Sequence, residues 1–218
     1  MKKLLLLIGI LILALGCSSE PEIVHKKIIT TATHLPKATF TPIPQVSNTS
    51  IIQIDIPEYN RSDWKHWIDE DRDCQNTRHE VLIDESIGEI KFKDDKECQV
   101  LEGIWSDPFT GNEFNDASSL DIDHMVPLKN AHISGGWAWG KSKKSSYANS
   151  LSNTNHLIAV SLSANRSKGA RAPDEWKPTN REYWCEYANI WIEIKTNWGL
   201  TITQAESNAL NEMLNTCN

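Results

Sequence analysis

The first seventeen residues indicate the cellular compartment in which this chain folds. Met1 to Cys17 are two lysines followed by an apolar run and small residues. The apolar run is too short for a spanning helix, so we interpret it as a secretory signal peptide. It ends in Ala14-Leu15-Gly16-Cys17, which resembles a bacterial lipobox and predicts lipidation of Cys17. Cleavage without lipid is the alternative. We therefore expect the rest of the chain to lie outside the cytoplasm, held on a bacterial membrane that faces the periplasm or the cell exterior.

The cysteine count agrees with that compartment. The chain has five cysteines, and four remain if Cys17 carries lipid: Cys74, Cys98, Cys185 and Cys217. An even set in an oxidising compartment predicts two disulfides. None of the four belongs to a C-x-x-C pair, which argues against a structural zinc knuckle.

The composition divides the chain into three parts. Residues 1–17 are the signal peptide and lipobox. Residues 18–50 are rich in Thr, Pro and Ser and have no helical or strand period, so we interpret them as a disordered tether. Residues 51–218 remain for one folded domain, which is ample for a hydrophobic core.

Hydrophobic periodicity predicts a mixed α+β domain. Trp64, Trp67 and Ile68 share one face of a helix expected to start at Ser62. A turn is expected at 107–111, a long polar loop with an exposed His132 at 129–153, and a short helix at 163–168, capped by Ser163 and closed by Gly169. The expected strands are 90–92, 99–105, 120–126 and 157–160.

Two helices are expected to form the C-terminal part. Capping boxes begin at Thr179 and Thr203, and Gly199 can end the first helix. The short connection makes the helices antiparallel neighbours. This packing brings Cys185 close to Cys217, which predicts that disulfide and leaves Cys74 to pair with Cys98. The apolar stripe of the first helix consists of Tyr183, Tyr187, Ile190, Ile194 and Trp198, widened by Trp184 and Trp191.

Charge is distributed unevenly along the chain. The net charge is −7, but residues 58–97 carry 13 acidic and 7 basic residues, whereas residues 129–181 carry 9 basic and 2 acidic residues. A polyanion responds to the local field, so the basic segment can bind phosphate although the whole chain is acidic.

The residues that carry chemistry lie around this basic segment. Asp121-Ile-Asp123-His124-Met-Val-Pro127 precedes the loop, and Asn165-Arg166-Ser-Lys168-Gly169 follows the last strand. An imidazole can take a proton from water near neutral pH, while carboxylate and amide oxygens can hold a hard divalent cation. This set supplies what phosphodiester hydrolysis needs.

The ordered motifs resemble a known family. Asp-His-x-x-Pro, a loop, a short strand and Asn-Arg-Ser-Lys are similar to the HNH (ββα-metal) nucleases, and most similar to a secreted group related to the C-terminal domain of GmrSD-type restriction enzymes. The resemblance covers about residues 61 to 198. Its motifs are Trp64-x-x-Trp67, Asp73-Cys-Gln-x-Thr-Arg78, Trp105-x-Asp-Pro108, Leu120-Asp-Ile-Asp-His124 and Gly169-x-Arg171-x-Pro173-x-x-Trp176.

The resemblance implies a fold, a metal and residue roles. It implies a β-hairpin and a short helix around one divalent cation, Mg²⁺ or Mn²⁺, with flanking helices. His124 would be the general base, and Asp123 and Asn165 the metal ligands. The middle position, which orients the base, falls on His156 with Asn155 adjacent, and the choice between them stays open. Basic side chains that could contact phosphate are Arg166, Lys168 and Arg171.

Two further interpretations accompany this assignment. Asp121 is either a third ligand or, better, a structural hydrogen-bond acceptor. Asp69, Asp71, Asp73 and Glu80 have the spacing of a calcium loop, but Cys74 occupies the place of its glycine, which favours a solvated acidic segment.

We therefore expect a metal-dependent endonuclease that cleaves nucleic acid, DNA rather than RNA. The alternatives are a non-catalytic surface lipoprotein that captures nucleic acid through its basic segment, and a glycan-binding module that uses the tryptophans. The sequence indicates no protein partner.

Overall fold

The computed structural model describes residues 55–152 and 155–217. The signal peptide, Cys17 and the tether at 18–50 lie outside the described residues. Residues from Ile52 to Asn218 belong to one compact unit. Within the described part of the chain, no helix is long and apolar enough to cross a membrane.

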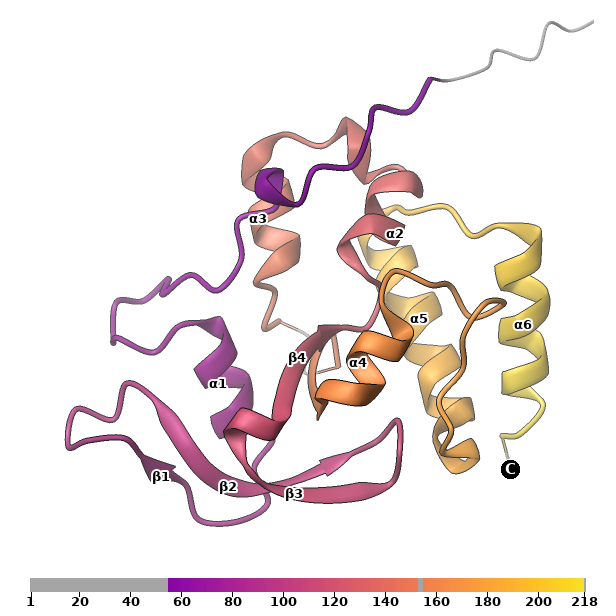
Figure 1. Ribbon diagram of the computed structural model, residues 1–218. Coiled ribbons are helices and arrows are strands. Elements are labelled where there is room, and N and C mark those ends of the chain that lie inside the picture. The colour runs from indigo at the N-terminus through magenta and orange to yellow at the C-terminus, as the bar shows by residue number, and fades with distance from the viewer. Residues whose placement is uncertain (1–54, 153–154, 218) are drawn as a thin grey trace, which may run out of the picture. The chain divides into compact units, whose positions relative to one another are not determined.

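The domain is α+β, with two antiparallel sheets and helices around them (Figure 1). A three-stranded sheet has the order β1-β2-β3, and a separate two-stranded sheet pairs β4 with β5. The strands are β1 (Lys91–Phe92), β2 (Val100–Asp107), β3 (Asn112–Asp116), β4 (Leu120–His124) and β5 (Leu157–Ser161). The four predicted strands are confirmed, and β3 completes the first sheet beyond the predicted turn at 107–111.

Six α-helices surround the sheets in the described residues. In Figure 1, α4 lies beside β4, while α5 and α6 stand together at one side. The helices are α1 (Thr77–Asp84), α2 (Leu128–Ile133), α3 (Lys141–Ala148), α4 (Leu162–Lys168), α5 (Trp184–Trp198) and α6 (Gln204–Leu214). Short 3-10 turns lie at Arg61–Asp63, Ala117–Ser119, Gly136–Ala138 and Arg181–Tyr183.

The C-terminal helix pair and both disulfides are confirmed. Cys185 bonds Cys217 and Cys74 bonds Cys98. Thr203 caps α6 in a full capping box, and Gly199 ends α5 in the left-handed conformation. The expected start at Thr179 is wrong by a short distance, because its hydroxyl donates to the Phe109 carbonyl instead. The next residue caps a 3-10 turn that leads into α5.

The two faces of the β4–β5 sheet are packed against different clusters. Strand alternation places Ile122 and Ala159 on one face, where they pack with Val81 and Leu82 of α1. Ile158 and Val160 point to the other face and join the cluster that contains α5. We call these the α1 side and the α4 side of the sheet, because α4 also lies against the second face.

The predicted helix from Ser62 is wrong. Only a 3-10 turn capped by Asn60 forms there, and Trp67 has a φ of 57° that ends any helical path. The reason is that Trp64 and Trp67 pack into two different hydrophobic clusters. Trp64 is fully buried in the cluster with α5, whereas Trp67 packs against the cluster with α1.

The predicted polar loop at 129–153 is also wrong, because it contains α2 and α3. His132 was expected to be exposed but is buried, with Nε2 donating to the Pro57 carbonyl at 2.7 Å. Asn149 is buried too, and its side chain binds both Lys65 and Ile68. Polar residues that are buried with hydrogen-bond partners hide a helix from hydrophobic periodicity.

The acidic segment before α1 is an exposed turn. Carboxylate oxygens of Asp69, Asp71 and Asp73 lie within 4.8 Å of one another. Asp69 accepts hydrogen bonds from the backbone N–H groups of Arg72 and Cys74. These bonds give the carboxylate a structural role in the turn.

Candidate active site

A cavity of about 330 Å³ gathers the residues predicted to carry chemistry. Asp123 and His124 reach it from the end of β4, and Asn165 and Arg166 reach it from α4. Strand β5 leads directly into α4 because Ser161, the last residue of β5, caps α4 by accepting from the Ala164 N–H. Ser161 therefore takes the capping role predicted for Ser163.

His124 is buried at the end of β4, with a relative exposure of 6%. Its Nε2 lies 2.9 Å from the Ala148 carbonyl oxygen at the end of α3. A carbonyl only accepts, so Nε2 must carry the proton and the neutral ring has an unprotonated Nδ1. Burial is the main cause that holds the pKa of His124 well below its ordinary value, and His156 adds to it. The ring is therefore neutral at pH 7, as a general base requires.

His156 supports this arrangement indirectly. Its Nε2 donates to the Tyr147 carbonyl at 2.8 Å, one residue before the carbonyl that binds His124. The Tyr147 ring stands nearly parallel to the His124 ring, and its hydroxyl donates to the Val126 carbonyl. Burial lowers the pKa of His156 to about 4, so it too is neutral. Asn155 lies in the turn before β5 and is partly exposed.

Asp123 is buried on the α4 side of the sheet beside an ammonium group. Lys168 Nζ lies 2.7 Å from Asp123 Oδ2 and 2.9 Å from the His124 carbonyl. Burial raises the pKa of Asp123, and the charge of Lys168 opposes this rise. The ion pair occupies Oδ2 and leaves Oδ1 for another partner.

Asn165 has its amide oriented by Asp121. Asn165 Nδ2 donates to Asp121 Oδ2 at 3.0 Å, and a carboxylate can only accept. The amide oxygen of Asn165 must therefore point away from Asp121. Asp121 is the structural acceptor that the sequence favoured. Asp123 and Asn165 line the same cavity, and a carboxylate with an amide oxygen is a donor set that fits a hard divalent cation.

The basic residues predicted for phosphate are placed differently from one another. Arg166 is exposed and lines the cavity, whereas Arg171 is exposed but does not line it. Lys168 is fully buried against Asp123, so the predicted phosphate contact is wrong for this residue. The α4 residues at the cavity come from its C-terminal half, so the positive end of this helix does not face the cavity.

The sequence missed several residues at this site. Tyr59, Arg61 and Lys129 also line the cavity, and the Trp67 ring lies 5.8 Å from the His124 ring. Ala148 contributes only its carbonyl, which no side-chain pattern reveals. The Trp64-x-x-Trp67 motif was the available signal for the first segment, but a helical face was the wrong interpretation of it.

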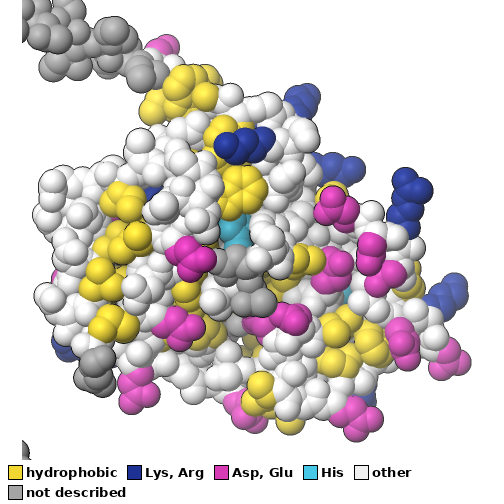
Figure 2. Space-filling view, turned by 180° about the vertical axis from the view of Figure 1, so that it is seen from behind, with side chains coloured by type: hydrophobic (Ala, Val, Ile, Leu, Met, Phe, Trp, Pro, Cys, Tyr) yellow, Lys and Arg dark blue, Asp and Glu magenta, His cyan; other side chains and the backbone are white. Residues whose placement is uncertain are grey.

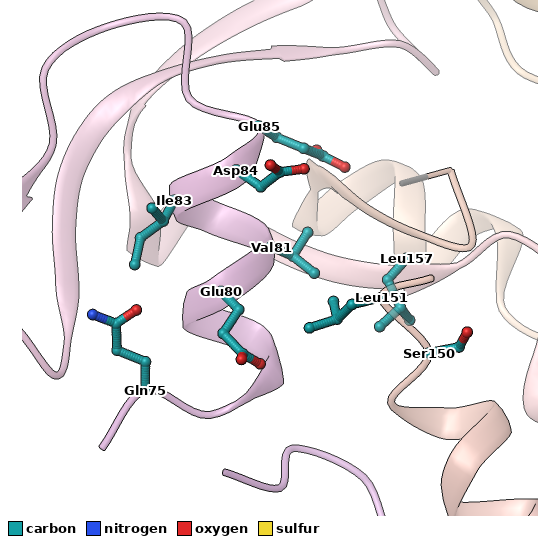
Figure 3. A pocket seen from close by; sticks show the side chains of 9 residues that line it. All are labelled: Gln75, Glu80, Val81, Ile83, Asp84, Glu85, Ser150, Leu151 and Leu157. Atoms are coloured by element: carbon teal, nitrogen blue, oxygen red, sulfur yellow. The ribbon is translucent and has the colours of Figure 1, made fainter. Parts of the chain in front are cut away.

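A second cavity, of about 370 Å³, lies on the α1 side (Figure 3). Figure 3 shows Val81 on α1 facing Leu151 and Leu157. At the end of α1, Glu85 accepts a hydrogen bond from the Ala159 N–H at 2.8 Å. Burial raises the pKa of Glu85 to about 7. This cavity contains none of the residues predicted for catalysis.

Both acidic and basic side chains lie on one face of the molecule (Figure 2). On the face seen from behind in Figure 2, acidic side chains are spread over the centre, and several lysines and arginines stand at one edge. That face does not present a continuous basic surface. At the cavity of His124, the lining basic residues are Arg61, Lys129 and Arg166.

Comparison with known proteins decides the family. Residues 76–213 match the model described as the C-terminal domain of GmrSD restriction endonucleases. The chain belongs to this family. The match includes Asp123, His124, His156 and Asn165, and it relates the chain to nucleases.

A curated relative supports the assignment. An uncharacterized secreted protein of Arthroderma benhamiae is 42% identical over 159 residues, which cover 73% of this chain and 76% of that protein. No solved structure matches the chain.

Proposed function

We propose that this member of the GmrSD C-terminal domain family is a metal-dependent endonuclease that hydrolyses phosphodiester bonds of nucleic acid outside the cytoplasm. The observation that carries the proposal is the state of His124. Its Nε2–H is bound to the Ala148 carbonyl, which leaves Nδ1 unprotonated, and His124 lines one cavity together with Asp123 and Asn165. The succession of β4, β5 and α4 supports the hairpin and short helix of a ββα-metal site.

Each residue has a defined task in this reaction. His124 Nδ1 accepts a proton from the attacking water. Asp123 Oδ1 and the Asn165 amide oxygen would hold a divalent cation, Mg²⁺ or Mn²⁺, which neutralises charge on the phosphate and the leaving oxygen. Lys168 favours the charged form of Asp123 by opposing the rise in its pKa that burial causes. Arg166 contacts a phosphate oxygen from the cavity wall.

The neighbours of His124 orient it. His156 holds the Tyr147 carbonyl, and the following residue holds His124 Nε2–H. His156 is therefore the better candidate for the middle motif position, as a positioning residue that acts through the end of α3. Through this arrangement, His156 would ensure that Nδ1 of His124, and not Nε2, accepts the proton from water.

The compartment is also part of the proposal. Two disulfides and a relative described as secreted support an extracytoplasmic location. We expect Cys17 to carry the lipid that holds the chain at a membrane. Replacement Cys17→Ser should release the protein into the aqueous phase on detergent partitioning, whereas unchanged partitioning would reject the anchor.

A plasmid-nicking assay tests the activity. The wild-type protein is expected to nick DNA in Mg²⁺ or Mn²⁺ and to stop when EDTA removes the metal. A parallel assay with single-stranded RNA tests the preference for DNA. Binding without cleavage in any divalent metal would contradict the proposal and favour a nucleic-acid-capturing lipoprotein instead.

A further inference from the structure

The segment of residues 57–68 forms part of the catalytic cavity although it precedes the family match. The match begins at residue 76, yet Tyr59 and Arg61 line the same cavity as His124. In Figure 1 this segment, drawn in indigo, passes above α2 and α3 before it turns down to α1. Part of the cavity wall is therefore built by residues outside the matched region.

Hydrogen bonds and buried side chains hold this segment in place on both sides of Arg61. On one side, the Pro57 carbonyl accepts from His132 Nε2 at 2.7 Å. On the other side, Trp64 is fully buried, and its ring lies 5.5 Å from the Tyr147 ring. The Lys65 carbonyl accepts from Asn149 Nδ2 at 2.7 Å. These contacts fix the position of the backbone at Arg61. The positions that its side chain can occupy at the cavity are therefore limited.

The charge of Arg61 is available for a ligand. Among residues 55–152 and 155–217, no carboxylate forms an ion pair with Arg61. Its polar contacts are with the Tyr59 hydroxyl and with His66 Nε2, the latter a long contact of 3.4 Å, and neither partner is a carboxylate. His66 Nδ1 donates to the Trp64 carbonyl, so Nε2 is the acceptor that orients the guanidinium. The positive charge of Arg61 is also among the causes that lower the pKa of His124.

The cavity as a whole is positively charged. Arg61, Lys129 and Arg166 line it, and Asp123 is the carboxylate among the lining residues. The charge of Asp123 is already matched by Lys168. Three cations without a matching carboxylate around one opening favour an anion, and a guanidinium suits phosphate because it donates two parallel hydrogen bonds.

We propose that Arg61 is a substrate-binding residue that holds a backbone phosphate of the nucleic acid at the cavity of His124. This inference rests on the proposed nuclease function. It predicts that Arg61 contributes to binding in a salt-dependent way and irrespective of base sequence, because phosphate contacts carry no sequence information.

The test compares Arg61→Gln and Arg61→Lys with a matched control, Arg72→Gln. Arg72 is exposed and does not line the cavity. Steady-state plasmid cleavage gives kcat/KM, and fluorescence anisotropy with a DNA oligonucleotide in EDTA gives Kd at several salt concentrations. Thermal unfolding of each variant confirms that it is folded.

We expect Arg61→Gln to lower kcat/KM by about 10-fold to 100-fold and to reduce the slope of log K against log salt by about 1. Arg61→Lys should keep the slope and recover part of the rate, and Arg72→Gln should match the wild type. Folded Arg61→Gln protein with wild-type cleavage and slope would overturn the inference.

The two proposals can fail separately. Wild-type protein that binds DNA without cleaving it contradicts the proposed nuclease, while the salt slope still decides the role of Arg61. Wild-type protein that cleaves normally while Arg61→Gln is unaffected contradicts only the role of Arg61. Wild-type protein that neither binds nor cleaves nucleic acid contradicts both.

Discussion

Two carboxylates lie against the β4–β5 sheet in different electrostatic surroundings. Asp123, on the α4 side, is paired with the fully buried ammonium of Lys168. Glu85, on the α1 side, accepts from the backbone N–H of Ala159, and within the described residues no lysine or arginine forms an ion pair with it. The pKa of Glu85 is accordingly raised to about 7 by burial.

This difference shows which of the two buried carboxylates has a cationic partner to oppose the effect of burial on its pKa. Burying a lysine is costly unless its charge is paired, and apolar packing is often as stable as a buried ion pair. Under the proposed function, Lys168 opposes the rise in the pKa of Asp123 that burial causes, a role that stability alone does not require. Glu85 has no such partner, so its role is to satisfy a backbone donor at the edge of β5.

The largest effect is expected at the ion pair. Asp123→Ala leaves the buried Lys168 ammonium with the His124 carbonyl but without a counter-charge, and we expect the free energy of unfolding to fall by about 3–5 kcal/mol. Cleavage should be lost as well, because a proposed metal ligand is gone. Denaturant titration and the nicking assay measure the two effects.

A second variant separates stability from function. The double replacement Asp123→Ala with Lys168→Met removes both charges and should recover much of the stability but none of the cleavage. Asp95→Ala, on the exposed turn before β2, is the control and should change stability by less than about 0.5 kcal/mol. If Asp123→Ala is as stable as the wild type, loss of the ion pair between Asp123 and Lys168 does not destabilise the fold.

The next largest effect is the pH dependence of the free energy of unfolding, to which Glu85 contributes. Its folded pKa of about 7 exceeds the unfolded value of 4.5, so the folded state binds the proton more tightly. This contribution to stability is complete below pH 4.5 and is lost as pH rises through 7. Allowing for partial exposure, the loss is about 2 kcal/mol.

Glu85→Gln should remove this pH dependence. The glutamine keeps an oxygen that can accept from the Ala159 N–H, so melting temperatures at pH 5 and pH 8 should lie closer together than in the wild type. Glu113→Gln, on an exposed part of β3, is the control and should retain the wild-type difference. Equal pH dependence in Glu85→Gln and the wild type would show that another group is responsible.

The smallest expected effect is a change in kcat on replacement of Trp67, which packs on the α1 side of the sheet and lies beside His124. Trp67 packs with the cluster around α1, and its ring lies 5.8 Å from the His124 ring. Trp67→Ala should lower kcat by about 10-fold, or about 1.4 kcal/mol, because His124 is held less firmly. KM should stay near the wild-type value.

Two variants control for this effect. Trp67→Phe should recover part of the rate, since it restores an aromatic ring beside His124. Trp137→Ala removes a tryptophan that lies in the 3-10 turn Gly136–Ala138, and it should leave kcat unchanged. A Trp67→Ala protein with normal kcat would mean that His124 is oriented by the end of α3 alone.

Local signals predicted much of this fold. The strands, the helix pair and the disulfides follow from alternation, capping boxes and antiparallel packing, which involve neighbouring residues. The ordered Asp-His and Asn-Arg-Ser-Lys motifs likewise led to Asp123, His124 and Asn165, which the structure brings to one cavity.

The misses have a common physical cause. Helix α1 is capped by Asn76 and buries only Thr77, Val81 and Leu82, so its apolar pattern is short. Helices α2 and α3 bury polar side chains such as His132 and Lys144, whose partners lie far along the chain. Lys168 looked like a phosphate ligand because its burial depends on tertiary packing, which spacing does not reveal.

The most direct test of the account is the replacement His124→Ala. If Nδ1 of His124 is the base, this variant should cleave plasmid DNA in Mg²⁺ or Mn²⁺ about 10³-fold more slowly than the wild type. Its Kd for DNA should stay within about 2-fold, since phosphate binding is assigned to other residues. Cleavage by folded His124→Ala protein at the wild-type rate would contradict the account.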